Sequence, residues 1–134
     1  MTAARAIRIL FVCVENAGRS QMAAALLNHH ARGRASADSA GTRPAQRVHE
    51  VVVEVMHEVG IDLAAAQPKI LTPEMAASAD RLVTMGCGDQ CPAVATPMED
   101  WNLPDPAGRS PDEVREIRDE IDRRVQALLD RITS

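Results

Sequence analysis

The sequence predicts an α/β fold, a three-layer α/β/α sandwich around a four-stranded, mostly parallel sheet. Three observations lead to this prediction. The 134 residues suffice for one domain with one core, so 1–134 is taken as a single domain. Stretches rich in Val, Ile and Leu alternate with stretches of helical periodicity, as in βαβ units. The first apolar stretch is continuous rather than alternating, which is typical of a strand buried on both faces.

Four strands are expected. The N-terminal strand is the clearest, because its apolar run is continuous and rich in β-branched residues. The second is weak and is followed by Gly and Pro, and the fourth is short and centred on Trp101. The expected ranges are Ile7–Val12, Ala35–Ser39, Arg81–Met85 and Met98–Leu103.

Four helices are expected between and after these strands. The Val-rich segment from residue 48 would favour a strand by propensity, but its apolar residues recur at helical spacing and Gly60 provides a C-terminal stop. Thr72 and Ser110 are suitable N-caps, each followed by a proline. The expected ranges are Arg19–His30, Val48–Val59, Pro73–Ser78 and Pro111–Ile132.

Composition and charge exclude several classes of protein. The net charge is −4, whereas non-specific nucleic-acid binding needs a basic face. No apolar stretch approaches the roughly 20 residues of a membrane span, and the N-terminus has no signal-peptide pattern. We therefore expect a cytoplasmic protein with no nucleic-acid or membrane partner. In that compartment three cysteines are more often reactive than structural. A monomer is also expected, although the sequence itself does not reveal the oligomeric state.

The segment directly after the first strand has the composition of an oxyanion-binding loop. Cys13 and Arg19 bracket five residues, Ser20 follows, and a helix is expected to begin there. Backbone N–H groups and the helix N-terminus would surround the anion, and the guanidinium would hold two of its oxygens. In this positive field we expect Cys13 to be a nucleophilic thiolate near neutral pH. The expected oxyanion-binding residues are Cys13, Val14, Glu15, Asn16, Ala17, Gly18 and Arg19.

Several motifs, in this order along the chain, resemble the arsenate reductases of the low-molecular-weight tyrosine-phosphatase superfamily. They are the Cys-x5-Arg-Ser loop at residues 13–20, Ser39-Ala40-Gly41, Asp80 with Val83-Thr84-Met85, the two later cysteines, and Asp105-Pro106-Ala107-Gly108. The resemblance covers nearly the whole chain. It implies the phosphatase-type anion loop after the first strand and arsenate, or a phosphate-like oxyanion, as the ligand.

The resemblance also implies roles for individual residues. Cys13 would attack arsenate, Arg19 would stabilise the transition state, and Ser20 would donate a hydrogen bond to the thiolate. Asp105 would be the general acid that protonates the leaving oxygen. Read without the resemblance, Ser20 is a plain helix cap and Asp105 belongs to an ordinary Asp-Pro turn.

Cys87 and Cys91 distinguish a reductase from a phosphatase. In the reductases of this family, a second cysteine attacks the cysteine–arsenic adduct and a third attacks the resulting disulfide, which thioredoxin then reduces. The Cys-x3-Cys spacing and the neighbouring glycines at 86 and 88 suit such a relay, but leave open which cysteine attacks first. A zinc site would need a second ligand pair, which the histidines do not supply, and a permanent disulfide is unusual in the cytoplasm. No tightly bound cofactor or metal is expected.

Three residues are expected to brace the loop: Asn16, Ser39 and Lys69. Some reductases of the family bind potassium through two acidic residues, whose positions here match Ala24 and Lys69. The Lys69 ammonium could replace the ion and hold Asn16 and Ser39; the alternative is that Lys69 is an ordinary solvated surface residue. Glu15 departs from the family pattern, and because a carboxylate repels an oxyanion, we expect its side chain to point to solvent.

The leading hypothesis is therefore arsenate reduction by Cys13, Cys87 and Cys91 with thioredoxin as electron donor. A tyrosine phosphatase is the second hypothesis, although the chain has no Tyr and one Phe to wall an aromatic ring. A non-enzymatic oxyanion or redox sensor is the third. A low-molecular-weight thiol such as mycothiol is an alternative donor, which the two spare cysteines argue against.

Overall fold

The structure is a computed structural model that describes residues 6–86 and 94–133. In these residues four strands form one sheet in the order β2-β1-β3-β4, and every neighbouring pair is parallel. The predicted α/β class with a parallel sheet is confirmed. The strands are β1 (Ile7–Cys13), β2 (Ala35–Gly41), β3 (Arg81–Thr84) and β4 (Met98–Asp100).

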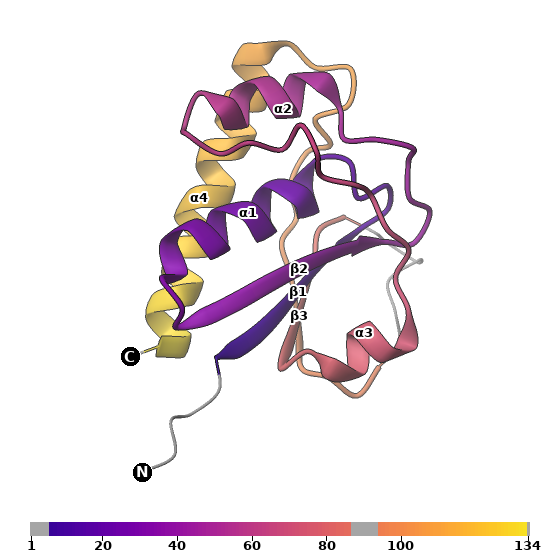
Figure 1. The fold of residues 1–134 in the computed structure, drawn as a ribbon, viewed down its shortest axis with the longest axis vertical. Coiled ribbons are helices and arrows are strands. Elements are labelled where there is room, and N and C mark those ends of the chain that lie inside the picture. The colour runs from indigo at the N-terminus through magenta and orange to yellow at the C-terminus, as the bar shows by residue number, and fades with distance from the viewer. Residues whose placement is uncertain (1–5, 87–93, 134) are drawn as a thin grey trace.

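Helices lie on both faces of the sheet, as the three-layer prediction requires. One face carries the larger core, to which α1, α2 and α4 contribute, and the other carries a smaller core under α3 (Figure 1). The helices are α1 (Arg19–Ala31), α2 (Glu50–His57), α3 (Pro73–Ser78) and α4 (Pro111–Thr133).

The central strand β1 serves both cores because its side chains alternate between the faces. Ile9, Phe11 and Cys13 point into the larger core, and Leu10 and Val12 into the smaller one. All five are at most 3% exposed, which explains why this stretch is apolar without interruption. Trp101 packs on Phe11 with ring centroids 5.5 Å apart, so the tryptophan belongs to the core.

The structure differs from the sequence prediction mainly at the ends of elements. The second helix is shorter at both ends than the predicted 48–59: His49 is extended and caps α2, and the chain leaves the helix before Gly60, whose φ is +82°. The fourth strand ends at Asp100. Trp101 still donates its backbone N–H to the Thr84 carbonyl at 2.8 Å, but its ring turns into the core.

The caps are as predicted. The Thr72 hydroxyl accepts the Met75 backbone N–H at 3.2 Å at the start of α3. At the start of α4, Ser110 and Glu113 exchange hydrogen bonds as a capping box.

The strand order reverses direction at the carboxyl ends of β1 and β3. From β1 the chain adds β2 on one side and then returns to add β3 on the other, and ligands of open parallel sheets bind at such a switch point. Cys13 is the last residue of β1, and Gly86 follows β3 by two residues. The topology therefore predicts the functional site between these two strand ends.

Candidate active site

The anion loop, residues 13–20, joins the end of β1 to the first turn of α1. Its residues are buried except for half-buried Val14 and exposed Glu15. Gly18 is the N-cap of α1, so the loop leads directly into the positive end of the helix dipole. Asn16 has a φ of 52°, a left-handed conformation that Asn adopts more readily than most residues. The predicted strand–loop–helix context is present.

The carbonyl oxygens of the anion loop are held on its outer side by the connection that follows β2. Carbonyls that face outward leave the amide N–H groups of the loop to face its inside, where an anion would sit. Four backbone bonds run from the N–H groups of Thr42, Arg43, Ala45 and His49 to the carbonyls of Cys13, Val14, Glu15 and Ala17, with N···O distances of 3.2, 2.8, 2.9 and 3.0 Å respectively.

Gly41 lets this connection approach the loop. A Cβ atom at residue 41 would lie 2.6 Å from the Val14 carbonyl oxygen and 3.0 Å from the Asn16 nitrogen. Any side chain there would push the loop away from β2. This contact is the physical reason for a glycine at the end of the Ser39-Ala40-Gly41 motif.

The Cys13 thiol is buried at the base of the loop, with 2% of the residue exposed. Its Sγ lies 2.8 Å from the Ser20 Oγ and accepts the Asn16 backbone N–H at 3.3 Å. Both groups can donate to a sulfur anion. The structure thus brings Cys13 and Ser20 together as the sequence predicted.

Asn16 connects the loop to the rest of the protein through its side chain. Its Nδ2 donates to the Ser20 Oγ at 2.7 Å, and its Oδ1 accepts the Lys69 backbone N–H at 3.0 Å and the Gln21 Nε2 at 3.2 Å. The sequence prediction that Asn16 is a bracing residue agrees with this geometry. It missed Gln21, although a buried polar residue directly after Ser20 on an Ala- and Leu-rich helix was a detectable signal.

Lys69 braces the loop through its backbone and not through its ammonium group. The Lys69 Nζ forms an ion pair with Asp38, and about half of each side chain is exposed. The prediction that the ammonium holds Asn16 and Ser39 is therefore wrong. The two side chains meet at the surface because residue 69 lies beside the end of β2, where its carbonyl accepts the Gly41 N–H at 2.9 Å. Ser39 is buried in β2, opposite Phe11 of β1.

These residues do not fit the potassium ion that some reductases of the family hold beside the loop. A cation needs oxygen ligands, but residue 24 is a buried Ala on α1 and residue 69 is a Lys. The Asn16 Oδ1 already accepts two N–H groups. Hydrogen-bond donors of the protein thus already occupy the side-chain oxygen of Asn16.

Arg19 lies at the mouth of the loop with 8% of the residue exposed. Its Nη1 donates to the Leu103 carbonyl at 3.1 Å, and its Nη2 is 3.8 Å from the Asp105 Oδ2. The backbone of Gly86 covers the guanidinium: a Cβ atom there would lie 2.3 Å from Nη1. The Arg19 side chain is thus held by Leu103, which follows β4, and by Gly86, which follows β3.

Asp105 is the exposed partner in this arrangement, with about half of its side chain accessible. Its Oδ1 accepts the Ala107 N–H at 3.0 Å, which fixes the turn, and its Oδ2 faces Arg19. Pro106 packs on the loop, because a Cβ atom at Gly18 would lie 2.6 Å from the proline Cγ. The turn thereby holds a carboxyl group over the anion loop.

Glu15 points to solvent, as expected for a carboxylate beside an anion site. About half of its side chain is exposed, and its Oε1 lies 3.9 Å from the Nε2 of His49. The departure from the family pattern therefore places no negative charge inside the loop.

Cys87 and Cys91 lie outside the described residues. The structure describes the chain up to Gly86, whose φ is +85°, and again from Val94. Gly86, the last residue described before them, lies against Arg19.

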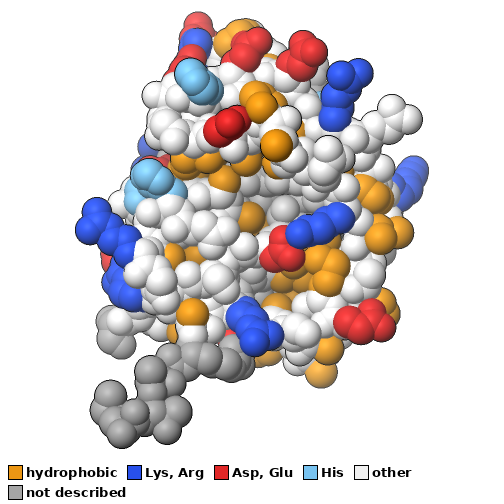
Figure 2. All heavy atoms as spheres, viewed as in Figure 1, with side chains coloured by type: hydrophobic (Ala, Val, Ile, Leu, Met, Phe, Trp, Pro, Cys, Tyr) orange, Lys and Arg blue, Asp and Glu red, His pale blue; other side chains and the backbone are white. Residues whose placement is uncertain are grey.

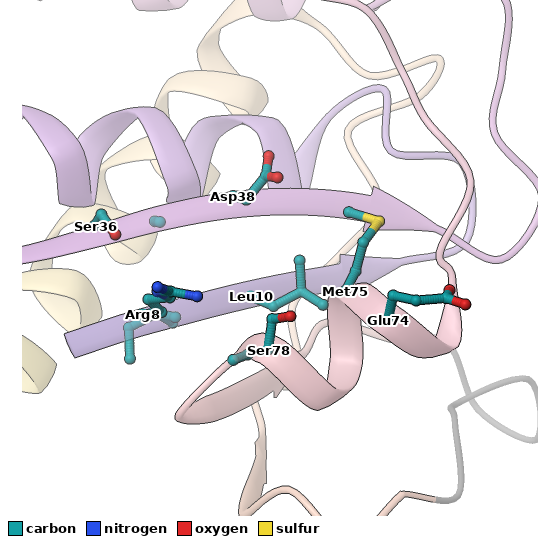
Figure 3. A pocket seen from close by; sticks show the side chains of 10 residues that line it. Arg8, Leu10, Ser36, Asp38, Glu74, Met75 and Ser78 are labelled. Atoms are coloured by element: carbon teal, nitrogen blue, oxygen red, sulfur yellow. The ribbon is translucent and has the colours of Figure 1, made fainter. Parts of the chain in front are cut away.

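Other surface features lie apart from the anion loop. A hollow of about 370 Å³ lies over β1, β2 and α3, and its walls carry both signs of charge, including Arg8, Asp38 and Glu74 (Figure 3). Acidic and basic side chains are interspersed on the face shown in Figure 2, and that face carries no extended patch of basic side chains. In residues 6–86 and 94–133, no three His, Cys, Asp or Glu side chains gather as metal ligands. Nor does any described helix combine the length and apolar character needed to cross a bilayer.

The buried cysteine in an anion loop between a parallel strand and a helix defines the class of protein. The chain belongs to the family described as low molecular weight phosphotyrosine protein phosphatase, whose family model matches residues 8–134. The resemblance stated from the sequence is confirmed.

Within this family the chain is similar to proteins named as arsenate reductases. A Halobacterium salinarum protein, provisionally named an arsenate reductase, is 43% identical over 97% of this chain and 96% of its own length. The glutaredoxin arsenate reductase of a Synechocystis species is 32% identical over 94% of this chain and 98% of its own. The solved structure of the Corynebacterium glutamicum thioredoxin-dependent arsenate reductase Cg_ArsC1' matches with a TM-score of 0.83 and 40% identity over 98% of this chain. The match covers 64% of that longer chain.

Proposed function

We propose that this protein reduces arsenate to arsenite with Cys13 as nucleophile and Cys87 and Cys91 as an internal relay. The observation that carries the proposal is the contact between Gly86 and Arg19. It brings the residue before Cys87 to the guanidinium of the anion loop. A phosphatase would need the loop and the acid but would have no use for two cysteines that follow this contact.

In the first step the Cys13 thiolate attacks arsenic and forms an S–As bond. One As–O bond breaks, and Asp105 supplies the proton with which that oxygen leaves as water. The inward N–H groups of the loop and the Arg19 guanidinium stabilise the charge on the remaining oxygens. Arsenic is still As(V) in this adduct.

In the second step one of the two later cysteines, as a thiolate, attacks the Cys13 Sγ. An S–S bond forms, the electron pair of the S–As bond stays on arsenic, and arsenite, As(III), is released. The remaining cysteine then attacks this disulfide, which frees Cys13 and leaves a Cys87–Cys91 disulfide. Two thiols have supplied the two electrons, and the spacing leaves open which cysteine acts first.

A dithiol protein of the thioredoxin class then reduces the disulfide by the same exchange chemistry. The relatives named for thioredoxin and for glutaredoxin support a thiol donor of this kind. Mycothiol or another small thiol is the alternative electron donor. Such a thiol would take over the role of one of the two relay cysteines.

The test is an assay of steady-state arsenate turnover with thioredoxin, thioredoxin reductase and NADPH, in which the oxidation of NADPH reports the rate. Cys13→Ser should abolish turnover. Of Cys87→Ser and Cys91→Ser, the variant that lacks the cysteine attacking first should stop at the arsenic adduct, and the other should stop after releasing one arsenite. Mass spectrometry of the oxidised protein should show Cys87 joined to Cys91. Full multiple turnover in both Cys87→Ser and Cys91→Ser would refute the relay. Turnover that depends on mycothiol would show that mycothiol, and not thioredoxin, is the electron donor.

Phosphatase activity is the second candidate because the family model describes phosphotyrosine phosphatases. The loop and Asp105 would serve phosphoryl transfer equally well. However, Phe11 and Trp101 are buried in the core, so neither can wall an aromatic ring at the site. We therefore expect only slow hydrolysis of p-nitrophenyl phosphate. A rate above that of arsenate turnover would make phosphatase the main activity.

A further inference from the structure

We propose that Gln21 is a positioning residue for Cys13. Its side-chain amide fixes the orientation of Asn16, and through Asn16 it directs the Ser20 hydroxyl hydrogen toward the sulfur. The inference rests on the proposed use of Cys13 as nucleophile. Gln21 itself touches neither the sulfur nor the inside of the anion loop.

Two backbone groups determine which way the amides point. The Gln67 carbonyl can only accept, so the Gln21 atom 3.3 Å from it must be the donor Nε2. The Lys69 backbone N–H can only donate, so the Asn16 atom 3.0 Å from it must be Oδ1. Side-chain amides are easily assigned the wrong way round, but here both ends of the chain of bonds are unambiguous.

The orientation is then transmitted to the sulfur. With Oδ1 held by Gln21 and Lys69, the Asn16 Nδ2 faces the Ser20 Oγ and donates to it at 2.7 Å. Since Ser20 receives a hydrogen from Asn16, its own hydrogen is free for Cys13, 2.8 Å away. A hydroxyl that donates to sulfur favours the thiolate, which is the reactive form.

Burial gives these bonds their strength. Asn16 and Ser20 are 0% exposed and Gln21 is 7% exposed, so water has little access to compete for their polar groups. Without Gln21, the Asn16 Oδ1 would keep only the hydrogen bond from the Lys69 backbone N–H. The Gln67 carbonyl would lose its hydrogen bond from Gln21. The Asn16 amide would then be held less tightly, and the Ser20 hydroxyl would spend less time directed at sulfur.

The experiment measures the rate at which iodoacetamide alkylates Cys13 as a function of pH. It uses the full chain with Cys87→Ser and Cys91→Ser, so that Cys13 alone reacts. Gln21→Met keeps the size of the side chain and removes its donor; Gln21→Glu keeps the shape and replaces the donor by a carboxylate. Gln126→Met is the matched control, since Gln126 is exposed on α4 and bonds only to Asp122 among the described residues.

We expect the midpoint of the pH profile to rise by about half a unit or more in both Gln21 variants, and to stay unchanged in Gln126→Met. The charged groups around the loop, Arg19, Asp105, Glu15, His49 and the Lys69–Asp38 pair, are the same in the parent, Gln21→Met and Gln126→Met. Gln21→Glu adds a carboxylate whose charge would itself raise the midpoint, so the size of the effect is taken from Gln21→Met. Circular dichroism selects variants with the parent's fold, and if Gln21→Met does not fold, an unchanged midpoint in Gln21→Glu would still overturn the inference.

An unchanged midpoint in a folded Gln21 variant would overturn the inference. The measurement does not involve arsenate. If the parent protein turned over no arsenate with any reductant, the proposed function would fail while a shifted midpoint would still support the role of Gln21.

Discussion

The backbone of Gly86 lies directly against the guanidinium of Arg19. A Cβ atom at residue 86 would be 2.3 Å from Nη1 and 3.3 Å from Cζ, and the φ of Gly86 is +85°. The chain directly after β3 therefore forms one wall of the position in which Arg19 is held. The same Nη1 donates a hydrogen bond to the Leu103 carbonyl at 3.1 Å.

Gly86→Ala should displace the Arg19 side chain and weaken oxyanion binding. The loss of one well-placed donor in an oxyanion site costs about 10²- to 10³-fold in rate, and we expect arsenate turnover to fall by a factor of this order. Calorimetric titration with phosphate should show a parallel loss of affinity.

Gly60→Ala is the matched control for this variant. Gly60 has nearly the same backbone conformation, with a φ of +82°, but nothing lies within 4 Å of a Cβ atom there. Both substitutions cost about 1–2 kcal/mol of backbone strain, whereas only Gly86→Ala meets Arg19. Equal phosphate affinities in the two variants would mean that the contact with Arg19 has no functional effect.

Asp105→Asn should lower turnover about 10²- to 10⁴-fold, because an amide cannot supply the proton that the leaving oxygen needs. The binding of phosphate should be retained or should tighten, since the carboxylate 3.8 Å from Nη2 competes for Arg19. Single-turnover formation of the arsenic adduct, followed by rapid quenching, separates the two effects. An Asp105→Asn protein with the parent's rate of adduct formation would exclude Asp105 as the general acid.

The anion loop could be predicted because the residues that form it are close together in the sequence. Cys13, Arg19 and Ser20 lie within eight residues, between a strand and a helix that each have a clear apolar pattern. The helix dipole, the guanidinium and the thiol must then meet, whatever the rest of the fold does. The exposed position of Glu15 could also be anticipated, from simple charge repulsion.

The wider surroundings of the loop depend on tertiary register and could not be predicted in the same way. Whether the Lys69 ammonium reaches Asn16 or Asp38 depends on where residue 69 meets the end of β2. The sequence does not specify that contact, and the prediction for Lys69 was wrong. The contact of Gly86 with Arg19 joins residues 67 positions apart and likewise requires the folded sheet.

Glu58 should contribute to stability in a pH-dependent way. It ends α2 and binds Arg115 and Arg118 of α4 at 2.8 and 2.9 Å. The hydrogen bond from Arg115 is the main cause that lowers the pKa of Glu58 from 4.5 to about 2. Since the folded state binds the proton more weakly, this contribution is present above about pH 4.5 and is lost as the pH falls toward 2. The carboxylate is exposed, so salt should weaken the effect.

Glu58→Gln should therefore lower the urea midpoint at neutral pH, and its difference from the parent should shrink as the solution is acidified. Glu54→Gln is the control, because it removes the same charge from α2 and its carboxylate forms no ion pair with any described residue. A difference between Glu58→Gln and the parent that is constant from neutral pH to acid would show that the ion pair is not its origin.

Turnover should not depend on potassium. Potassium supports a loop of this kind only where oxygen ligands are free to surround it, and here the Asn16 Oδ1 is occupied by the N–H groups of Gln21 and Lys69. Replacing potassium chloride by sodium chloride at constant ionic strength should leave kcat and KM for arsenate unchanged, and potassium should not raise the melting temperature. A rise in activity specific to potassium in the parent protein would mean that the ion displaces the Gln21 amide from Asn16, which contradicts the hydrogen-bond pattern described above.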